Sequence, residues 1–239
     1  MNQFEMTPST AFETSTVAAA ERVTAFLRAV YGWMCVGLGI TAAVAWGLFE
    51  SPQTMMAIAA NPVSRWGAIL APIGLVVLLA ARVDKMAPNT AAMVFAVYLA
   101  LNGIMFSFVL ATYTGTSIAS TFVVTAGMFG ALALLGTTTK RSLAGVGQFA
   151  FMGLVGLILA SIVGVFWHSS GMQFVISVVG VIVFTGLTAW DAQRLKLMAA
   201  AVPEGRFGSY AVVGALSLYL DFINLFLFLL RFLGVGRRD

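Results

Sequence analysis

The stretch Ala215–Arg231, with the sequence ALSLYLDFINLFLFLLR, is apolar enough to cross a lipid bilayer, yet Asp221 lies about halfway along it. A carboxylate at the bilayer centre costs roughly 2.5–3.5 kcal/mol on insertion scales. We therefore expect Asp221 to face the interior of a helix bundle, water or a partner group, and not lipid. If this helix is central, the other helices surround it, and the rest of the chain must supply a partner for Asp221.

The composition is that of an integral membrane protein. Of the 239 residues, 60% are hydrophobic and 9% are charged, whereas a soluble domain carries about 25% charged residues. A membrane-spanning helix needs about 20 mostly apolar residues, so nearly the whole chain lies in or beside the membrane as one domain. The net charge of +4 does not indicate a nucleic-acid partner, because the basic residues fall mainly in short loops and at the termini.

We predict an all-α integral membrane fold with seven transmembrane helices. The predicted spans cover residues 30–49, 66–81, 89–112, 117–136, 147–167, 173–190 and 210–233. Residues 1–21 are polar, and we expect a disordered tail there, followed by a transmembrane domain at 22–239. Small residues spaced by four let neighbouring helices approach closely. Two such rows are Gly39, Ala43 and Gly47, and Gly156, Ala160 and Gly164.

The basic residues predict the orientation of the chain. With seven spans, nine Lys and Arg lie on the side of the N-terminus and four lie on the other side. The positive-inside rule places the richer side, with the N-terminus, in the cytoplasm. The three arginines near the C-terminus oppose this arrangement, so an alternative in which the last segment enters the membrane and returns stays open.

Several catalytic and cofactor chemistries are excluded by the sequence. The single histidine, His168, lies in a predicted loop, which leaves neither a zinc-protease motif nor an intramembrane Ser–His pair. The three lysines lie in loops or at helix ends, so no span offers the lysine that a retinal Schiff base requires. Cys35 lies in an apolar stretch and has no second cysteine to pair with. We expect neither an enzyme nor a resident cofactor.

The carboxylates remain as the candidate functional groups. Asp191 opens a polar run directly after the sixth span, and this span is the antiparallel neighbour of the last one. At about 1.5 Å per residue, Asp221 lies roughly 17 Å deep and Asp191 roughly 9 Å deep, so helix tilt or water can close the gap. Two such carboxylates would titrate as a coupled pair and suit a hard cation such as Ca²⁺. The alternatives are a packing hydrogen bond for Asp221 and a solvated interfacial position for Asp191.

Two further residues complete the candidate site. Arg82 ends the second span on the side of Asp191 and is a candidate latch for that carboxylate, with a simple anchoring role as the alternative. Asn224 lies one turn beyond Asp221 and is a candidate oxygen ligand, with helix packing as the alternative. The predicted pH sensor and cation site is thus Asp191 and Asp221, with Arg82 and Asn224 as accessory residues.

The sequence ALSLYLDFINLFLFLLRFLG at 215–234 resembles the transmembrane BAX inhibitor motif family, also called the Bax inhibitor-1 family, and TAWDAQRLK at 188–196 supports the resemblance. The resemblance covers about residues 22–235 and implies a seven-helix bundle with the last helix at its centre. It also implies a pH-sensitive calcium leak channel, as among bacterial members, governed by an aspartate pair that matches Asp191 and Asp221. The family's basic latch matches Arg82 less closely, and this chain has no acidic residue within the second span.

The resemblance leaves other functions open. Some bacterial members act on a membrane-bound AAA protease, which implies a regulator of membrane-protein quality control as a second function, with residues 1–21 as the place of engagement. A cation/proton exchanger is the third. The implied location is the bacterial inner membrane with the N-terminus in the cytoplasm, and the implied partners are membrane lipid and calcium or other cations.

Overall fold

The computed structural model describes residues 8–166 and 169–237. Within these residues the long helices are α1 (Pro8–Phe49), α3 (Pro62–Arg82), α4 (Pro88–Thr112), α5 (Gly115–Thr138), α6 (Ala144–Phe166), α7 (Ser170–Ala201) and α8 (Phe207–Leu233). The short elements are the helix α2 (Pro52–Ala60) and the 3-10 turns η1 (Val83–Lys85) and η2 (Glu204–Arg206). Seven helices of this described part are long and apolar enough to cross a membrane, which confirms the all-α, seven-span prediction.

The predicted boundaries differ from the observed helices mainly near the N-terminus. α1 begins at Pro8 and includes most of the stretch that we expected to be a disordered tail. Proline suits the first turn of a helix, and no Gly or Pro follows before Gly32, so the sequence contains no stop signal there. The predicted loop 50–65 contains α2. Residues 1–7 of the expected tail and the predicted loop residue His168 lie outside the described residues.

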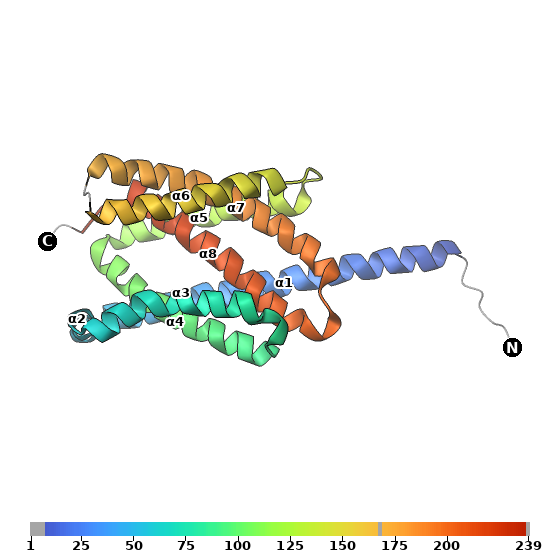
Figure 1. Cartoon of the computed structure of the whole chain (residues 1–239), viewed down its shortest axis with the longest axis horizontal. Coiled ribbons are helices and arrows are strands. Elements are labelled where there is room, and N and C mark those ends of the chain that lie inside the picture. The colour runs from blue at the N-terminus through green and yellow to red at the C-terminus, as the bar shows by residue number, and fades with distance from the viewer. Residues whose placement is uncertain (1–7, 167–168, 238–239) are drawn as a thin grey trace.

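α8 lies at the centre of the bundle. Fifteen of its 27 residues are buried, whereas the peripheral helix α3 buries two of its 21 residues. In Figure 1, α8 runs obliquely between α6 and α7 on one side and α3 and α4 on the other. Its main packing partners are α7, α1, α5 and α4. A helix that is apolar around most of its circumference can be buried on all sides, which explains why this stretch became the core.

The two ends of α8 are tied to the two ends of α4. At the start of α8, the Ser209 hydroxyl donates to the Met86 carbonyl (2.8 Å), just before α4 begins. After the end of α8, the Arg237 N–H donates to the carbonyl of Thr112 (2.9 Å), the last residue of α4. α4 has 25 residues, which makes it about 37 Å long. α8 therefore crosses the bundle completely, and the alternative of a last segment that enters and returns is not realised.

The closest helix contacts do not lie where the rows of small residues predicted them. A Cβ atom added at Gly39, Gly47 or Gly156 would meet nothing within 4 Å outside its own helix. The packing role predicted for these three glycines is therefore wrong. A close approach occurs instead at Gly136 of α5, where an added Cβ would overlap the Ala189 carbonyl of α7.

Candidate functional site

Asp191 is buried between α7 and α8. It lies ten residues before Ala201 at the end of α7, and Ser217 lies ten residues after Phe207 at the start of α8. Because the two helices are antiparallel, this register places both residues about 15 Å from the same end of the bundle. The Ser217 hydroxyl donates a hydrogen bond to Asp191 Oδ2. The side chain of Asp191 is thus held against α8 by a hydroxyl group from the central helix.

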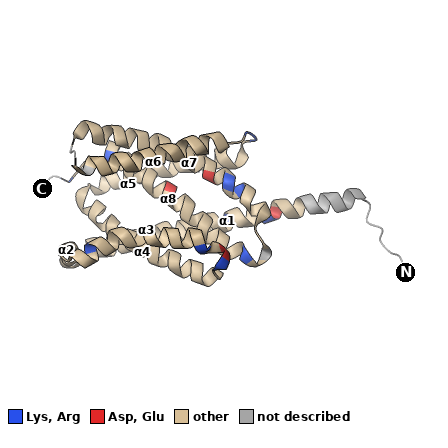
Figure 2. Cartoon of the chain, viewed as in Figure 1, with Lys and Arg blue, Asp and Glu red and all other residues tan. Residues whose placement is uncertain are grey.

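Asp221 lies four residues after Ser217 on α8, which is about 6 Å deeper in the bundle. The residue is 4% exposed, and Asp191 is 7% exposed. Asp221 is the acidic residue of α8 and lies near the middle of this helix, and Figure 2 shows how few charged positions the bundle carries away from its helix ends. Because Ser217 holds the Asp191 carboxylate, the two aspartates lie about one helical turn apart along α8. The structure therefore brings together the two aspartates that the sequence selected.

Each carboxylate has one buried oxygen without a hydrogen-bond partner among the described residues. Asp191 Oδ1 and Asp221 Oδ2 are buried, and neither has a hydrogen-bond partner among the described residues. Buried polar atoms in proteins are nearly always satisfied, because desolvation without compensation is costly. Two such oxygens within one helical turn can therefore accept a proton, a water molecule or a cation.

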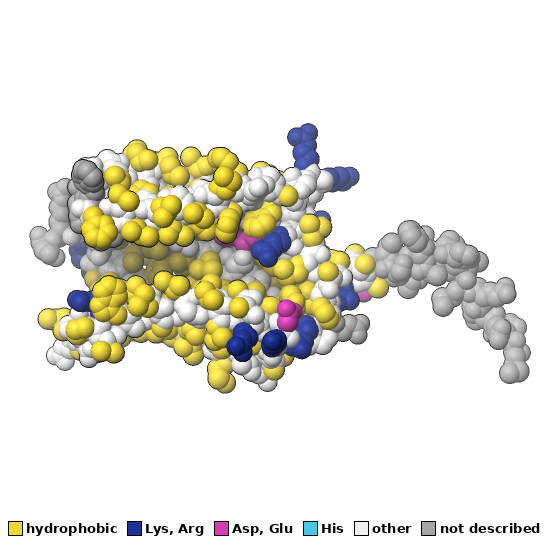
Figure 3. All heavy atoms as spheres, viewed as in Figure 1, with side chains coloured by type: hydrophobic (Ala, Val, Ile, Leu, Met, Phe, Trp, Pro, Cys, Tyr) yellow, Lys and Arg dark blue, Asp and Glu magenta, His cyan; other side chains and the backbone are white. Residues whose placement is uncertain are grey.

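A cavity of about 290 Å³ reaches Asp191, but not Asp221, from one side of the bundle. Asp191, Ser217 and Arg194 line it together with residues of α3 such as Val76 and Ala80. Figure 3 shows a groove between the side formed by α6 and α7 and the side formed by α3 and α4, with acidic and basic side chains at one end of it. α3 packs mainly on α4 and only lightly on α8, so the α3 side of the groove is held in place chiefly through α4.

The basic partner of Asp191 is Arg194 and not Arg82. The Arg194 guanidinium lies 3.9 Å from Asp191 Oδ1 and also lies over the Trp190 ring, 5.4 Å from its centroid. Residues three apart share one face of a helix, so this pair is a consequence of α7 alone. Arg82 is exposed at the end of α3, and the described residues give it no ion pair with Asp191. The latch predicted for Arg82 has no support in this geometry, and Arg194 occupies that position.

Comparison with known proteins decides the family. The family profile described as "Inhibitor of apoptosis-promoting Bax1" matches residues 23–238. The chain belongs to the Bax inhibitor-1 family. It is 46% identical over 215 residues to the protein named "Inner membrane protein YbhL" of Escherichia coli, covering 89% of this chain and 92% of that protein. It is 43% identical over 216 residues to an uncharacterized protein of Borreliella burgdorferi, with 90% and 93% of the two chains covered.

Asn224 is not part of the aspartate site of this Bax inhibitor-1 family protein. Its side-chain amide donates to the Leu220 carbonyl of its own helix (2.8 Å). It lines a different cavity of about 370 Å³, together with Ser161 of α6 and Phe184 of α7. The structure therefore favours the packing alternative for Asn224, and the predicted role as a ligand beside Asp221 has no support in this arrangement.

The polar run after Asp191 ties α7 to its neighbours, a role that we did not predict. Gln193 accepts a hydrogen bond from the Leu143 N–H (2.7 Å), and Lys196 donates to the Thr137 carbonyl (2.6 Å). These two residues tie α7 to the end of α5 and the α5–α6 loop. The family sequence TAWDAQRLK thus has two sides, one that anchors α7 and one that presents Asp191 and Arg194 to the cavity. The sequence contains a signal for these two sides: Asp191 and Arg194 are three residues apart, as are Gln193 and Lys196, and residues at this spacing share a helix face.

The aspartate pair offers oxygen ligands but no complete metal cage. Within the described residues, no group of three or more His, Cys, Asp or Glu is placed to hold a metal ion. Ca²⁺ takes six to eight oxygen ligands, so water would have to complete the shell of a cation held by Asp191, Ser217 and Asp221. The donor set of this Bax inhibitor-1 family protein suits a transient cation and not a tightly bound one.

Proposed function

We propose that this multi-pass membrane protein of the Bax inhibitor-1 family passively conducts cations, Ca²⁺ among them, under the control of pH. The observation that carries the proposal is the pair of buried carboxylate oxygens, on Asp191 and Asp221, that have no hydrogen-bond partner among the described residues. In a membrane-spanning bundle, an ionisable side chain is a functional-site hypothesis by default, because it is expensive to keep there. The cavity that reaches Asp191 supports an aqueous route to the first of the two carboxylates.

The proposed route has two parts. A cation enters the cavity beside Arg194, meets Asp191 and then Asp221, and sheds part of its hydration shell for carboxylate oxygens. Beyond Asp221, the ring of Phe222 packs against the rings of Phe122 and Phe129, with 5.5 Å between centroids in both pairs. Conduction requires this aromatic layer to open. Protonation of either aspartate removes negative charge from the route, and protonation of Asp191 also weakens its ion pair with Arg194. Both changes make the flux depend on pH.

Calcium flux into proteoliposomes of the purified protein tests this function. We expect an inward Ca²⁺ flux down its gradient that changes with pH and needs no counter-ion gradient. A flux that runs only when a second ion moves in the opposite direction would establish an exchanger. No flux above that of protein-free liposomes at any pH would exclude both conduction and exchange.

We also propose that the protein lies in the bacterial inner membrane with its N-terminus in the cytoplasm. The name of the Escherichia coli relative supports the location. The orientation is supported by the nine Lys and Arg on the side of the N-terminus, against four on the other side. A phosphatase reporter that is active only outside the cytoplasm is expected to be silent when fused at Lys140. The same reporter is expected to be active when fused after residue 239. Activity at Lys140 and silence at the C-terminus would reverse the proposed orientation.

A second candidate function is regulation of a membrane-bound protease. It is favoured by α1, which extends beyond the other helices of the bundle (Figure 1). Deletion of residues 2–20 is expected to leave Ca²⁺ flux in liposomes unchanged, because it removes none of the site and keeps Arg22, which donates to the Val202 carbonyl. Loss of flux would make the N-terminal segment part of the conduction machinery. Loss of protease inhibition in cells, with intact flux, would favour the regulatory function.

A further inference from the structure

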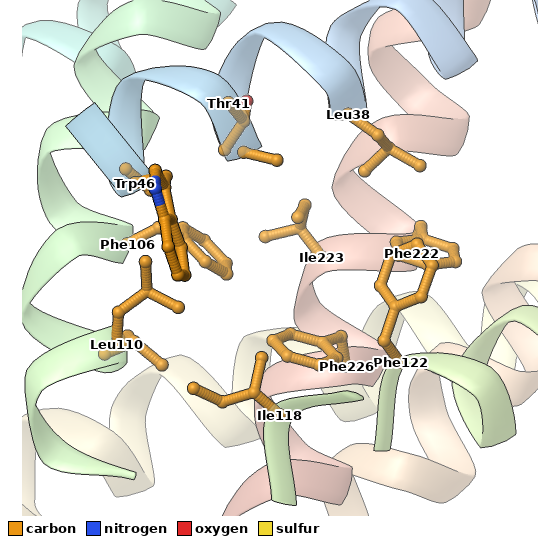
Figure 4. Close-up of a pocket in the computed structure, with 13 residues that line it drawn as sticks. Leu38, Thr41, Trp46, Phe106, Leu110, Ile118, Phe122, Phe222, Ile223 and Phe226 are labelled. Carbon is orange, nitrogen blue, oxygen red and sulfur yellow. The ribbon is translucent and has the colours of Figure 1, made fainter. Parts of the chain in front are cut away.

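A second cavity, separate from the aspartate site, lies between α1, α4, α5 and α8 (Figure 4). Its volume is about 180 Å³, and its walls are aliphatic and aromatic, with Leu38, Trp46, Phe106 and Phe226 among them. The polar side chain in the wall, Thr41, already hydrogen-bonds with the Tyr219 hydroxyl (2.8 Å). Apolar cavities of about 150 Å³ stay dry and bind apolar ligands. This cavity therefore suits a hydrocarbon group and not a hydrated ion.

The depth of the cavity matches one leaflet of a bilayer. Along α1 it reaches from Leu38 to Trp46, which is about 12 Å at the helical rise per residue. Half of the hydrocarbon core of a bilayer is about 15 Å thick. Trp46 is 60% exposed and lies near the end of α1, where aromatic side chains meet lipid headgroups. A single acyl chain that enters from this end would run along the cavity for most of one leaflet.

A cationic side chain lies near the Trp46 end of the cavity. The Arg237 guanidinium lies 5.2 Å from the centroid of the Phe49 ring, and the Phe49 and Trp46 rings are 6.0 Å apart. The backbone of Arg237 is held by its hydrogen bond to the Thr112 carbonyl (2.9 Å). Arginine binds phosphate through paired, charge-assisted hydrogen bonds. The end of the chain thus places a phosphate-binding group next to the mouth of a cavity that suits an acyl chain.

We propose that this cavity binds one acyl chain of a membrane phospholipid, with the lipid phosphate held by Arg237. A helix of a partner protein does not fit, because a helix is about 10 Å across and the cavity holds about 180 Å³. Neither Asp191 nor Asp221 lines this cavity, but Phe122 and Phe222 of the aromatic layer in the proposed cation route do.

Two neighbouring alanines of α1 provide a matched test of the acyl-chain site. Ala42 and Ala43 are both exposed, but only Ala42 belongs to the cavity wall. Delipidated protein is titrated with phosphatidylglycerol, and the bound fraction is measured by native mass spectrometry. We expect Ala42→Trp, whose indole fills the cavity, to lower the affinity for the first lipid by at least about tenfold. Ala43→Trp is expected to bind like the wild type, and equal binding by both variants would overturn the proposal.

The headgroup is tested with a second matched pair. Arg237→Gln is expected to weaken phosphatidylglycerol binding by about tenfold, because a charge-assisted contact is lost, and to leave binding of diacylglycerol unchanged. Arg231→Gln is the control, since Arg231 contacts the Phe228 ring and lines a different cavity. Unchanged phosphatidylglycerol binding in Arg237→Gln would overturn the phosphate contact. If the mass spectra showed a second copy of the chain bound at this cavity and no lipid, the proposed lipid site would be overturned.

Discussion

The Asp221→Asn variant is expected to lower the initial rate of Ca²⁺ entry into proteoliposomes by at least about tenfold, which corresponds to about 1.4 kcal/mol. Asparagine has nearly the shape of aspartate, so the buried position in the middle of α8 is filled as before. The change removes the deepest negative charge of the proposed route. A cation that has lost part of its water shell then has one anionic ligand fewer in the buried middle of the bundle, where few other polar groups can replace it.

The variants around Asp191 are expected to act on the pH profile and not on the maximal rate. Asp191→Asn keeps an oxygen for the Ser217 hydroxyl but loses the pair with Arg194. Arg194→Gln should therefore resemble Asp191→Asn, and the double variant should add little to either single change. Arg82→Gln is the matched control, because Arg82 is exposed at the end of α3. Ca²⁺ flux is measured between about pH 5 and 8, where most proteins are at their most stable, so that the fold stays intact during the comparison.

Two outcomes would contradict this assignment. An unchanged rate in Asp221→Asn, together with an unchanged pH profile in Asp191→Asn, would reduce both aspartates to packing residues. If the pH profile of Ca²⁺ flux shifted in Arg82→Gln and not in Arg194→Gln, Arg82 would be the latch for Asp191, as the sequence predicted. Arg82 would then reach Asp191 only in a second conformation of the bundle.

The sequence was sufficient for the fold and for the two aspartates because both depend on local, one-dimensional properties. Every backbone group within a bilayer must be satisfied by the protein, and an α-helix does this within its own segment, so apolar length predicts the helical spans. The depth of a residue follows from its position along a helix, and this placed Asp191 and Asp221 within reach of each other. The hydrogen bond from Ser217 follows from the same register of antiparallel helices, although we did not predict it.

The sequence was insufficient where the answer depends on how a helix is rotated and how closely it packs. Arg82 required α3 to pack against α7, but α3 packs mainly against α4. Asn224 lies three residues after Asp221, only about 60° away around α8, yet it lines a different cavity together with Ser161. Gly39 and Gly156 have suitable spacing for a packing face, yet no neighbouring helix lies beside them. Spacing identifies residues that share a face and leaves open what that face meets.

Gly136→Ala is expected to be the most destabilising single-methyl change between α5 and α7. The new Cβ would overlap the carbonyl of Ala189 and would lie 3.0 Å from the Cβ of Ala192. A backbone carbonyl cannot rotate away as a side chain can, so the two helices must separate beside Asp191. Overpacking of this kind costs about 1–3 kcal/mol or more, and it outweighs the gain of about 1 kcal/mol that alanine normally brings to a helix.

The matched control for this change lies on the same helix. Gly130 of α5 is exposed, and a Cβ added there would meet nothing within 4 Å. Gly130→Ala is therefore expected to keep or raise the melting temperature of the purified protein in detergent. Gly136→Ala is expected to melt at least about 4 °C lower than Gly130→Ala, the shift that about 2 kcal/mol produces in a chain of this size. Equal melting temperatures would mean that α5 and α7 do not approach this closely at Gly136, and the register that holds Asp191 against α8 would lose its support on that side.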